Sequence, residues 1–205
     1  MRQLFVMTAL VVSLTLANGL AQAGKVEVKG PHLCCQQCVK TVGGILAKVD
    51  GVSDAKCDTT NKTVTFTAKD AKTAEAAVKA LFEAGFFGAA TDDGKAIKIE
   101  VGKATGKSDE VTVKAVHVCC GMCQSAIKGL FKDATVSFGE GKPQKDVKIS
   151  AKGLDKAAVL DILRKAGFNG KIDLRAGCPS ADAVSTTARL GHSAGPFRCG
   201  TEKIE

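Results

Sequence analysis

The chain has 205 residues, enough for one large or two small domains, and a net charge of +8. The positive charge is spread as single Lys residues without an Arg-rich block, and the chain has no Trp or Tyr. We therefore expect no nucleic-acid partner, because such proteins use a clustered basic face, usually with stacking aromatic side chains.

Residues 1–23 are typical of a secretory signal peptide. Arg2 gives the positive start, an apolar core runs from Leu4 to Leu16, and Ala21-Gln22-Ala23 forms a small-x-small cleavage site. The apolar core is too short to span a membrane, and no later segment resembles a transmembrane helix. We expect a secreted or periplasmic protein whose mature chain starts near Gly24 and does not insert into a membrane.

Residues 24–101 predict the order strand, helix, strand, strand, helix, strand. Apolar alternation or steps of three and four residues place these elements, in order, at 25–29, 39–49, 52–57, 63–68, 73–84 and 97–101. Residues 59–62 join the two middle strands as a hairpin. Gly51 and Gly85 end the two helices.

Residues 109–175 repeat this order after a polar linker at 102–108 that is rich in Lys, Gly and Ser. The predicted elements lie at 111–115, 123–132, 135–138, 147–151, 155–166 and 172–174. The fold class expected is α+β, with two ferredoxin-like (βαββαβ) domains, each a four-stranded antiparallel sheet with two helices on one face.

From residue 176 to 205 the periodicity disappears, which predicts a flexible tail. The tail carries Cys178, His192 and Cys199. These residues are either adventitious or disulfide-bonded, or they form a third, weaker metal site. Cys57 lies in a predicted strand without a counterpart in the second repeat, so we expect a structural or incidental thiol there.

The pattern His-x-Cys-Cys-x-x-Cys occurs twice, once in each repeat, directly before a predicted helix. We call residues 32–38 motif 1 and residues 117–123 motif 2. Clustered thiols and imidazoles are soft donors that suit Cu(I), Zn(II), Cd(II) or Hg(II). The predicted metal ligands are Cys34, Cys35, Cys38, Cys119, Cys120, Cys123, His32 and His117.

A disulfide framework is the other interpretation of nine cysteines in an exported chain. The positions argue against it, because the cysteines gather at one place in each repeat. Adjacent residues such as Cys34 and Cys35 cannot easily pair with each other, and an odd total leaves one thiol unpaired.

The motif spacing predicts how the thiols bind. Cys38 and Cys123 should lie in the first turn of a helix, where free backbone N–H groups favour the thiolate. Two thiolates suit linear Cu(I) or Hg(II), a third from Cys34 or Cys119 permits a trigonal site, and a histidine can complete a tetrahedral one. Because each repeat has its own thiols, we expect each to bind one ion independently.

The chain resembles the heavy-metal-associated domain family, which includes copper chaperones, the N-terminal modules of metal-exporting P-type ATPases and periplasmic mercury-binding proteins. The family's Cys-x-x-Cys falls on Cys35/Cys38 and on Cys120/Cys123. The resemblance covers residues 25–101 and 109–175. Leu33 and Val118 take the place of its buried Met, while Gly51-Val52, Gly85-Phe86 and Gly167-Phe168 match its Gly-Val and Gly-Phe pairs.

The resemblance implies a metallochaperone or metal scavenger, not an enzyme. It favours Cu(I) or Zn(II), with Cd(II) or Hg(II) as further options, and a metal-transporting ATPase or another metal acceptor as partner. His32 and His117 replace a family glycine. Cys34 and Cys119 replace the residue that sets metal selectivity in the family, and the extra thiol favours three- or four-coordinate ions.

An exported thiol-disulfide redox protein is the alternative, because Cys-x-x-Cys at a helix start also serves oxidoreductases. Those enzymes carry the motif in another fold, beside a Trp and a cis-proline loop. This chain has no Trp and only four Pro.

Overall fold

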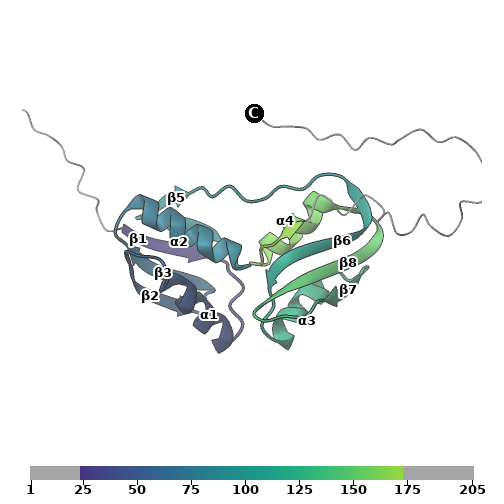
Figure 1. Ribbon diagram of the computed structural model, residues 1–205, viewed down its shortest axis with the longest axis horizontal. Coiled ribbons are helices and arrows are strands. Elements are labelled where there is room, and N and C mark those ends of the chain that lie inside the picture. Colours follow the sequence, from purple (N-terminus) through teal and green to yellow (C-terminus); the bar gives the residue numbers. More distant parts are fainter. Residues whose placement is uncertain (1–23, 173–205) are drawn as a thin grey trace, which may run out of the picture. The chain divides into compact units, whose positions relative to one another are not determined.

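The computed structural model describes residues 24–172, which fall within one compact unit and form two antiparallel sheets and four helices (Figure 1). The predicted signal peptide, Leu174 and the predicted tail lie outside the described residues. The elements in chain order are β1 (Gly24–Lys29), α1 (Gln36–Leu46), β2 (Val52–Asp58), β3 (Thr63–Ala68), α2 (Ala71–Glu83), β4 (Ala89–Asp92), β5 (Lys95–Ile97), β6 (Lys107–His117), α3 (Gly121–Leu130), β7 (Thr135–Phe138), β8 (Gln144–Asp155), α4 (Lys156–Lys165) and β9 (Lys171–Ile172).

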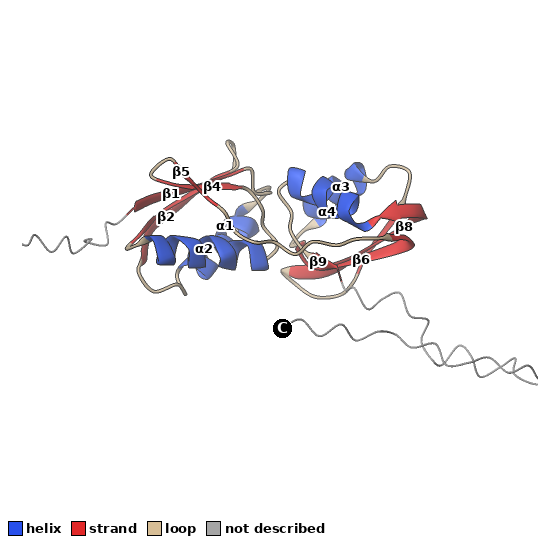
Figure 2. Ribbon diagram, turned by 90° about the horizontal axis from the view of Figure 1, so that it is seen from above, coloured by secondary structure: helices blue, strands red, loops and turns tan. Residues whose placement is uncertain are grey.

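The first sheet has the strand order β2-β3-β1-β4-β5, and α1 and α2 lie on one of its faces (Figure 2). On that face Val26 pairs with Phe66 and Val28 with Val64 across β1 and β3. All four side chains are at most 1% exposed. Alternating apolar residues therefore bury one side of the sheet under the apolar stripes of the two helices.

The sequence-based prediction for the last strand of the first sheet was wrong. β4 occupies the place beside β1, and β5 adds a fifth strand through a tight turn at Asp93 and Gly94, both with positive φ. Of the predicted strand at 97–101, only Ile97 lies in a strand. The Ala-Ala-Thr-Asp sequence of β4 has no apolar alternation, so the pattern pointed to the more apolar segment that follows it.

The second sheet has the order β7-β8-β6-β9, with α3 and α4 on one face (Figure 2). Val111 pairs with Ile149 and Val113 with Val147, and these residues form its core side. The predicted four strands and two helices are present here, but β6 and β8 are much longer than expected. The residues added at the start of β6 and at both ends of β8 are mostly polar, so apolar alternation marked only the middles of these strands.

A bulge near the end of β6 places motif 2. The pairing of β6 with β8 shifts register between Val113 and Val116, and Ala115 adopts a φ of +59°. Such a bulge adds a residue and redirects the strand beyond it. The three residues that follow, Val116 to Val118, are all buried.

Within residues 24–172, none of the helices combines the length and apolar character needed to cross a lipid bilayer.

Candidate metal site

Each motif ends in the first turn of a helix. Cys35 is the N-cap of α1 and Cys120 the N-cap of α3, and both have extended backbones. Cys38 and Cys123 are the third residues of these helices and are fully buried. Their predicted place in the first helical turn is confirmed. Here the unpaired N–H groups of the helix start favour negatively charged sulfur.

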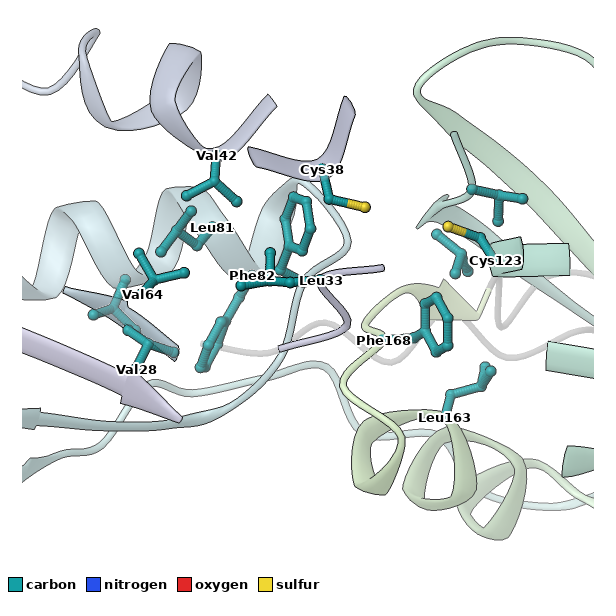
Figure 3. Close-up of a cluster of buried hydrophobic side chains, with 14 of the residues drawn as sticks. Val28, Leu33, Cys38, Val42, Val64, Leu81, Phe82, Cys123, Leu163 and Phe168 are labelled. Carbon is teal, nitrogen blue, oxygen red and sulfur yellow. The ribbon is translucent and has the colours of Figure 1, made fainter. Parts of the chain in front are cut away.

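The structure brings the sulfur atoms of both motifs into one cluster. Cys34 Sγ lies 3.5 Å from Cys123 Sγ, and Cys35 Sγ lies 3.7 Å from Cys119 Sγ and 3.9 Å from Cys120 Sγ. In Figure 3 the sulfur atoms of Cys38 and Cys123 point toward each other. The prediction of separate thiol groups, one in each repeat, therefore does not describe the geometry.

Hydrogen bonding and burial set the pKa values of the two buried thiols in opposite directions. The Cys123 thiol stabilises the Cys38 thiolate more than burial opposes it, and so lowers the pKa of Cys38. The pKa of Cys123 is raised, first by that same hydrogen bond to Cys38 and then by burial. The hydrogen bond therefore favours the negatively charged form of one of the two buried sulfurs, which attracts a cation.

The thiols nearer the surface also differ from ordinary cysteines. Burial raises the pKa of Cys34 and Cys119, which are the first cysteines of their motifs. Burial also acts to raise the pKa of Cys120, but hydrogen bonds from the backbone N–H of Cys123 and from the Cys34 thiol outweigh it and lower the pKa to about 7. Metal binding would displace the protons that the first cysteines retain.

Each histidine beside the sulfur cluster has at least one buried ring nitrogen without a hydrogen-bond partner among the described residues. His117 is fully buried, and neither of its ring nitrogens has a hydrogen-bond partner among the described residues. The same holds for Nε2 of His32, whose pKa is lowered mainly by burial. A buried imidazole without a partner is costly unless something binds it. Both side chains are therefore available as ligands.

Ligand atoms of these histidines lie close to sulfurs of both motifs. The atoms offered by His117, Cys38, Cys119 and Cys123 all lie within 4.8 Å of one another. Those of His32, Cys34 and Cys123 do the same. All eight predicted ligand residues thus meet around one cluster.

The contact that assembles this cluster was not predicted from the sequence. The N–H of Phe87 donates to the carbonyl of Gly167 (3.0 Å), and the N–H of Asn169 donates to the carbonyl of Gly85 (2.9 Å). Between these bonds Phe86 and Phe168 form a single antiparallel bridge. The two Gly-Phe pairs, assigned in the sequence to helix ends, join residues 24–101 to residues 102–172.

Cys57 lies in β2, half-buried, and burial raises its pKa. The groups of residues that could hold a metal ion in the described part of the chain do not include it. Cys178, His192 and Cys199 lie outside the described residues.

Comparison with known proteins supports the family resemblance of the first repeat. Residues 31–87 match the family model of the heavy-metal-associated domain. Among curated proteins, no sequence match to the chain reaches significance. The heavy-metal-associated match spans motif 1 and α2, and Leu33, in the place of the family Met, is 2% exposed as expected. Soft-metal binding is thus supported by both the family match and the cysteine cluster.

Proposed function

We propose that this protein is exported and captures soft metal ions, acting as a metallochaperone or a metal scavenger and not as an enzyme. The observation that carries the proposal is the packing of six cysteine sulfurs at separations of 3.5–3.9 Å. Sulfur and imidazole donors favour Cu(I), Zn(II), Cd(II) and Hg(II) over hard cations. Cu(I) or Zn(II) is the native ion that we propose, with Cd(II) and Hg(II) as further options.

The exposure of the thiols suits transfer of the ion to an acceptor. Cys38 and Cys123 are buried, whereas Cys34, Cys35 and Cys120 are only partly buried. An incoming thiolate can therefore approach the ion from the side of the outer sulfurs, bond to the ion and displace them one at a time while the inner sulfurs still hold it. A metal-transporting ATPase or another thiol-bearing acceptor is the partner that we propose.

Anaerobic titration of the mature chain tests metal capture. Cu(I), Zn(II) and Cd(II) are added in turn against a competing chelator, and bound metal is measured after desalting. We expect tight binding by the wild-type chain and by Cys57→Ser, and its loss when all six motif cysteines are replaced by Ser. Equal retention by the six-fold variant would place the metal elsewhere and end the proposal.

An insulin-reduction assay separates capture from redox catalysis. Metal capture predicts no turnover above that of a small free thiol, and it predicts that bound Cd(II) protects the motif cysteines from alkylation. Sustained turnover, with alkylation unaffected by metal, would instead favour an exported thiol-disulfide redox protein.

Export is tested on protein expressed with its own N-terminus. Cell fractionation should find the protein outside the cytoplasm, and N-terminal sequencing should start near Gly24. A cytoplasmic product that retains residues 1–23 would contradict export without affecting metal capture.

A further inference from the structure

The sulfur–sulfur contacts of the cluster close into two triangles. Triangle A consists of Cys34, Cys120 and Cys123, whose sulfurs lie 3.7 Å (Cys34–Cys120), 3.5 Å (Cys34–Cys123) and 3.8 Å (Cys120–Cys123) apart. Its members come from both motifs. Cys34 belongs to motif 1, and the other two are the Cys-x-x-Cys pair of motif 2.

Triangle B is the same arrangement with the motifs exchanged. It consists of Cys35, Cys38 and Cys119, and all three of its sulfur–sulfur separations are 3.7 Å. Here the Cys-x-x-Cys pair comes from motif 1 and the third sulfur from motif 2. Each of the six sulfurs therefore belongs to one triangle only.

We propose that each triangle binds one soft metal ion, so that the first cysteine of each motif serves the Cys-x-x-Cys pair of the other motif. The proposal deepens the proposed function and rests on it. The extra cysteine that distinguishes these motifs is thus a ligand supplied across the contact between the two repeats. The two ions would occupy two composite sites, neither of which one repeat can complete alone.

The dimensions of the triangles fit a three-sulfur site. The centre of an equilateral triangle with 3.7 Å sides lies about 2.1 Å from each corner. A displacement of less than about 1 Å from the plane then gives the bond length of about 2.3 Å that zinc makes to thiolate sulfur. Little movement of the sulfurs is needed to accept an ion.

The sulfurs of a single motif are arranged less favourably. In motif 1, Cys34 and Cys35 each lie 3.7 Å from Cys38, and the three sulfurs are all within 4.8 Å. In motif 1 two of the three sulfur pairs are thus in contact, whereas in each triangle all three pairs are in contact. Adjacent residues in a chain direct their side chains apart, whereas the triangles combine residues three apart with one from the other repeat.

A histidine lies beside each triangle. His32 lies within 4.8 Å of two sulfurs of triangle A, Cys34 and Cys123. His117 lies within 4.8 Å of two sulfurs of triangle B, Cys38 and Cys119, and of the Cys123 sulfur of triangle A. An imidazole can add a fourth ligand to three thiolates and complete a tetrahedral site. The unpaired ring nitrogens of these histidines are consistent with that role.

Two double variants with the same number of thiols test the assignment. Cys34→Ser/Cys120→Ser removes two corners of triangle A and leaves triangle B complete. Cys34→Ser/Cys35→Ser removes one corner of each triangle and leaves motif 2 complete. Cd(II) is titrated anaerobically into the full chain, because Cd(II) uses three or more sulfurs.

We expect the wild-type chain to bind two equivalents and the Cys34/Cys120 variant to keep one at wild-type affinity. Both equivalents of the Cys34/Cys35 variant should weaken by at least about tenfold, since even partners outside the ligand shell cost that much. If the Cys34/Cys35 variant kept one tight equivalent and both equivalents of the Cys34/Cys120 variant weakened, each ion would belong to a single motif and the proposal would be overturned. Loss of all binding in both variants would indicate one indivisible cluster, and one retained equivalent in both would make the first cysteines bystanders.

Correlation of ¹¹³Cd with cysteine protons in the wild-type chain gives an answer that does not depend on any variant. Two ¹¹³Cd signals are expected, one coupled to the β-protons of triangle A and the other to those of triangle B. Coupling of a single signal to all three cysteines of one motif would overturn the proposal. A chain that retains no Cd(II), Cu(I) or Zn(II) would instead contradict the proposed function itself.

Discussion

The imidazole ring of His117 stacks on the phenyl ring of Phe86, with 4.2 Å between the centroids and 28° between the planes. The reciprocal pair is present as well, because His32 stacks on Phe168 at 4.2 Å and 24°. Each histidine is therefore held against the Gly-Phe pair of the other repeat. The contact that joins the repeats also orients the imidazoles beside the sulfurs.

Phe86→Leu should release His117 while keeping an apolar side chain in place. We expect the free energy of unfolding to fall by about 1–3 kcal/mol, since the variant loses buried area and an aromatic contact. The ¹¹³Cd signal of triangle B should shift more than that of triangle A.

Phe66→Leu is the matched control, because Phe66 is equally buried but lies in β3, paired with β1. This variant should destabilise the chain and leave both signals unchanged. Equal shifts in both variants would show that the stacking does not orient His117.

Asn169 ties the second repeat to the C-terminal end of α2. Its side chain is buried, and its Nδ2 donates to the carbonyl of Phe82 at 2.9 Å, while its Oδ1 accepts from Arg164 Nε at 3.2 Å. Asn169→Leu leaves the Phe82 carbonyl without this partner in a buried place, which costs about 1–3 kcal/mol. Urea denaturation should show this loss. Asn61→Leu, at an exposed turn, is the control and should change stability less; an equal loss would mean that the buried hydrogen bond contributes nothing specific.

The sequence predicted the elements that bury a continuous apolar face. Apolar spacing alone predicts the strands that carry Val26, Phe66 and Ile149 and the helices that begin at the cysteine motifs. A face that is buried needs apolar residues at that spacing. β4 has small and polar residues, and its place in the sheet is set by pairing with β1. Tertiary pairing of this kind leaves no periodic pattern in the sequence.

The candidate ligand residues were chosen from the sequence, but their grouping in space was not predicted. Spacing within a motif shows which thiols are neighbours along the chain, and it suggested one ion for each motif. The contact between Phe86 and Phe168 joins two backbone segments that are 82 residues apart in numbering. Each segment carries a recognisable Gly-Phe pair, but nothing in the pairs shows that they contact each other. The signal that existed was the extra cysteine of each motif, which a single Cys-x-x-Cys site does not need.

Asp70 gives α2 a pH-dependent N-cap. Its Oδ1 accepts from the N–H of Thr73 at 2.7 Å, and the backbone N–H and side chain of Thr73 hold its pKa below the ordinary value of 3.8. The stabilisation is fully present above pH 3.8 and is lost as the pH falls through the lower pKa of the folded state. Asn at position 70 can cap the helix but cannot titrate. The free energies of unfolding of Asp70→Asn and wild type should therefore differ most at neutral pH and become equal at acid pH.

Urea denaturation of Asp70→Asn and wild type between pH 7 and pH 3 measures this difference. Glu75→Gln removes one charge from an exposed site on the same helix and serves as the control. An identical pH dependence in Asp70→Asn and Glu75→Gln would show that general charge, and not the cap, causes the effect.

A comparison of Gly85→Ala with Gly94→Ala should separate the strain of placing Ala in a left-handed backbone from the loss of contact between the repeats. Gly85 has a φ of +91°, and a Cβ there would lie 2.3 Å from the backbone nitrogen of His117. Gly94 has a φ of +80° in the turn between β4 and β5, and a Cβ there would meet no heavy atom of the described residues within 4 Å. Gly94→Ala should therefore lose only the backbone term of about 1–2 kcal/mol.

Gly85→Ala should lose more stability than Gly94→Ala, because a backbone atom cannot move aside as a flexible side chain can. It should also weaken Cd(II) at both triangles, since both take sulfurs from the two repeats across this contact. Chemical denaturation and anaerobic Cd(II) titration of the two variants measure the two effects on the same samples. If Gly85→Ala kept two tight equivalents while losing stability, the thiols would bind their ions without the Gly-Phe contact, and the composite sites would not depend on it.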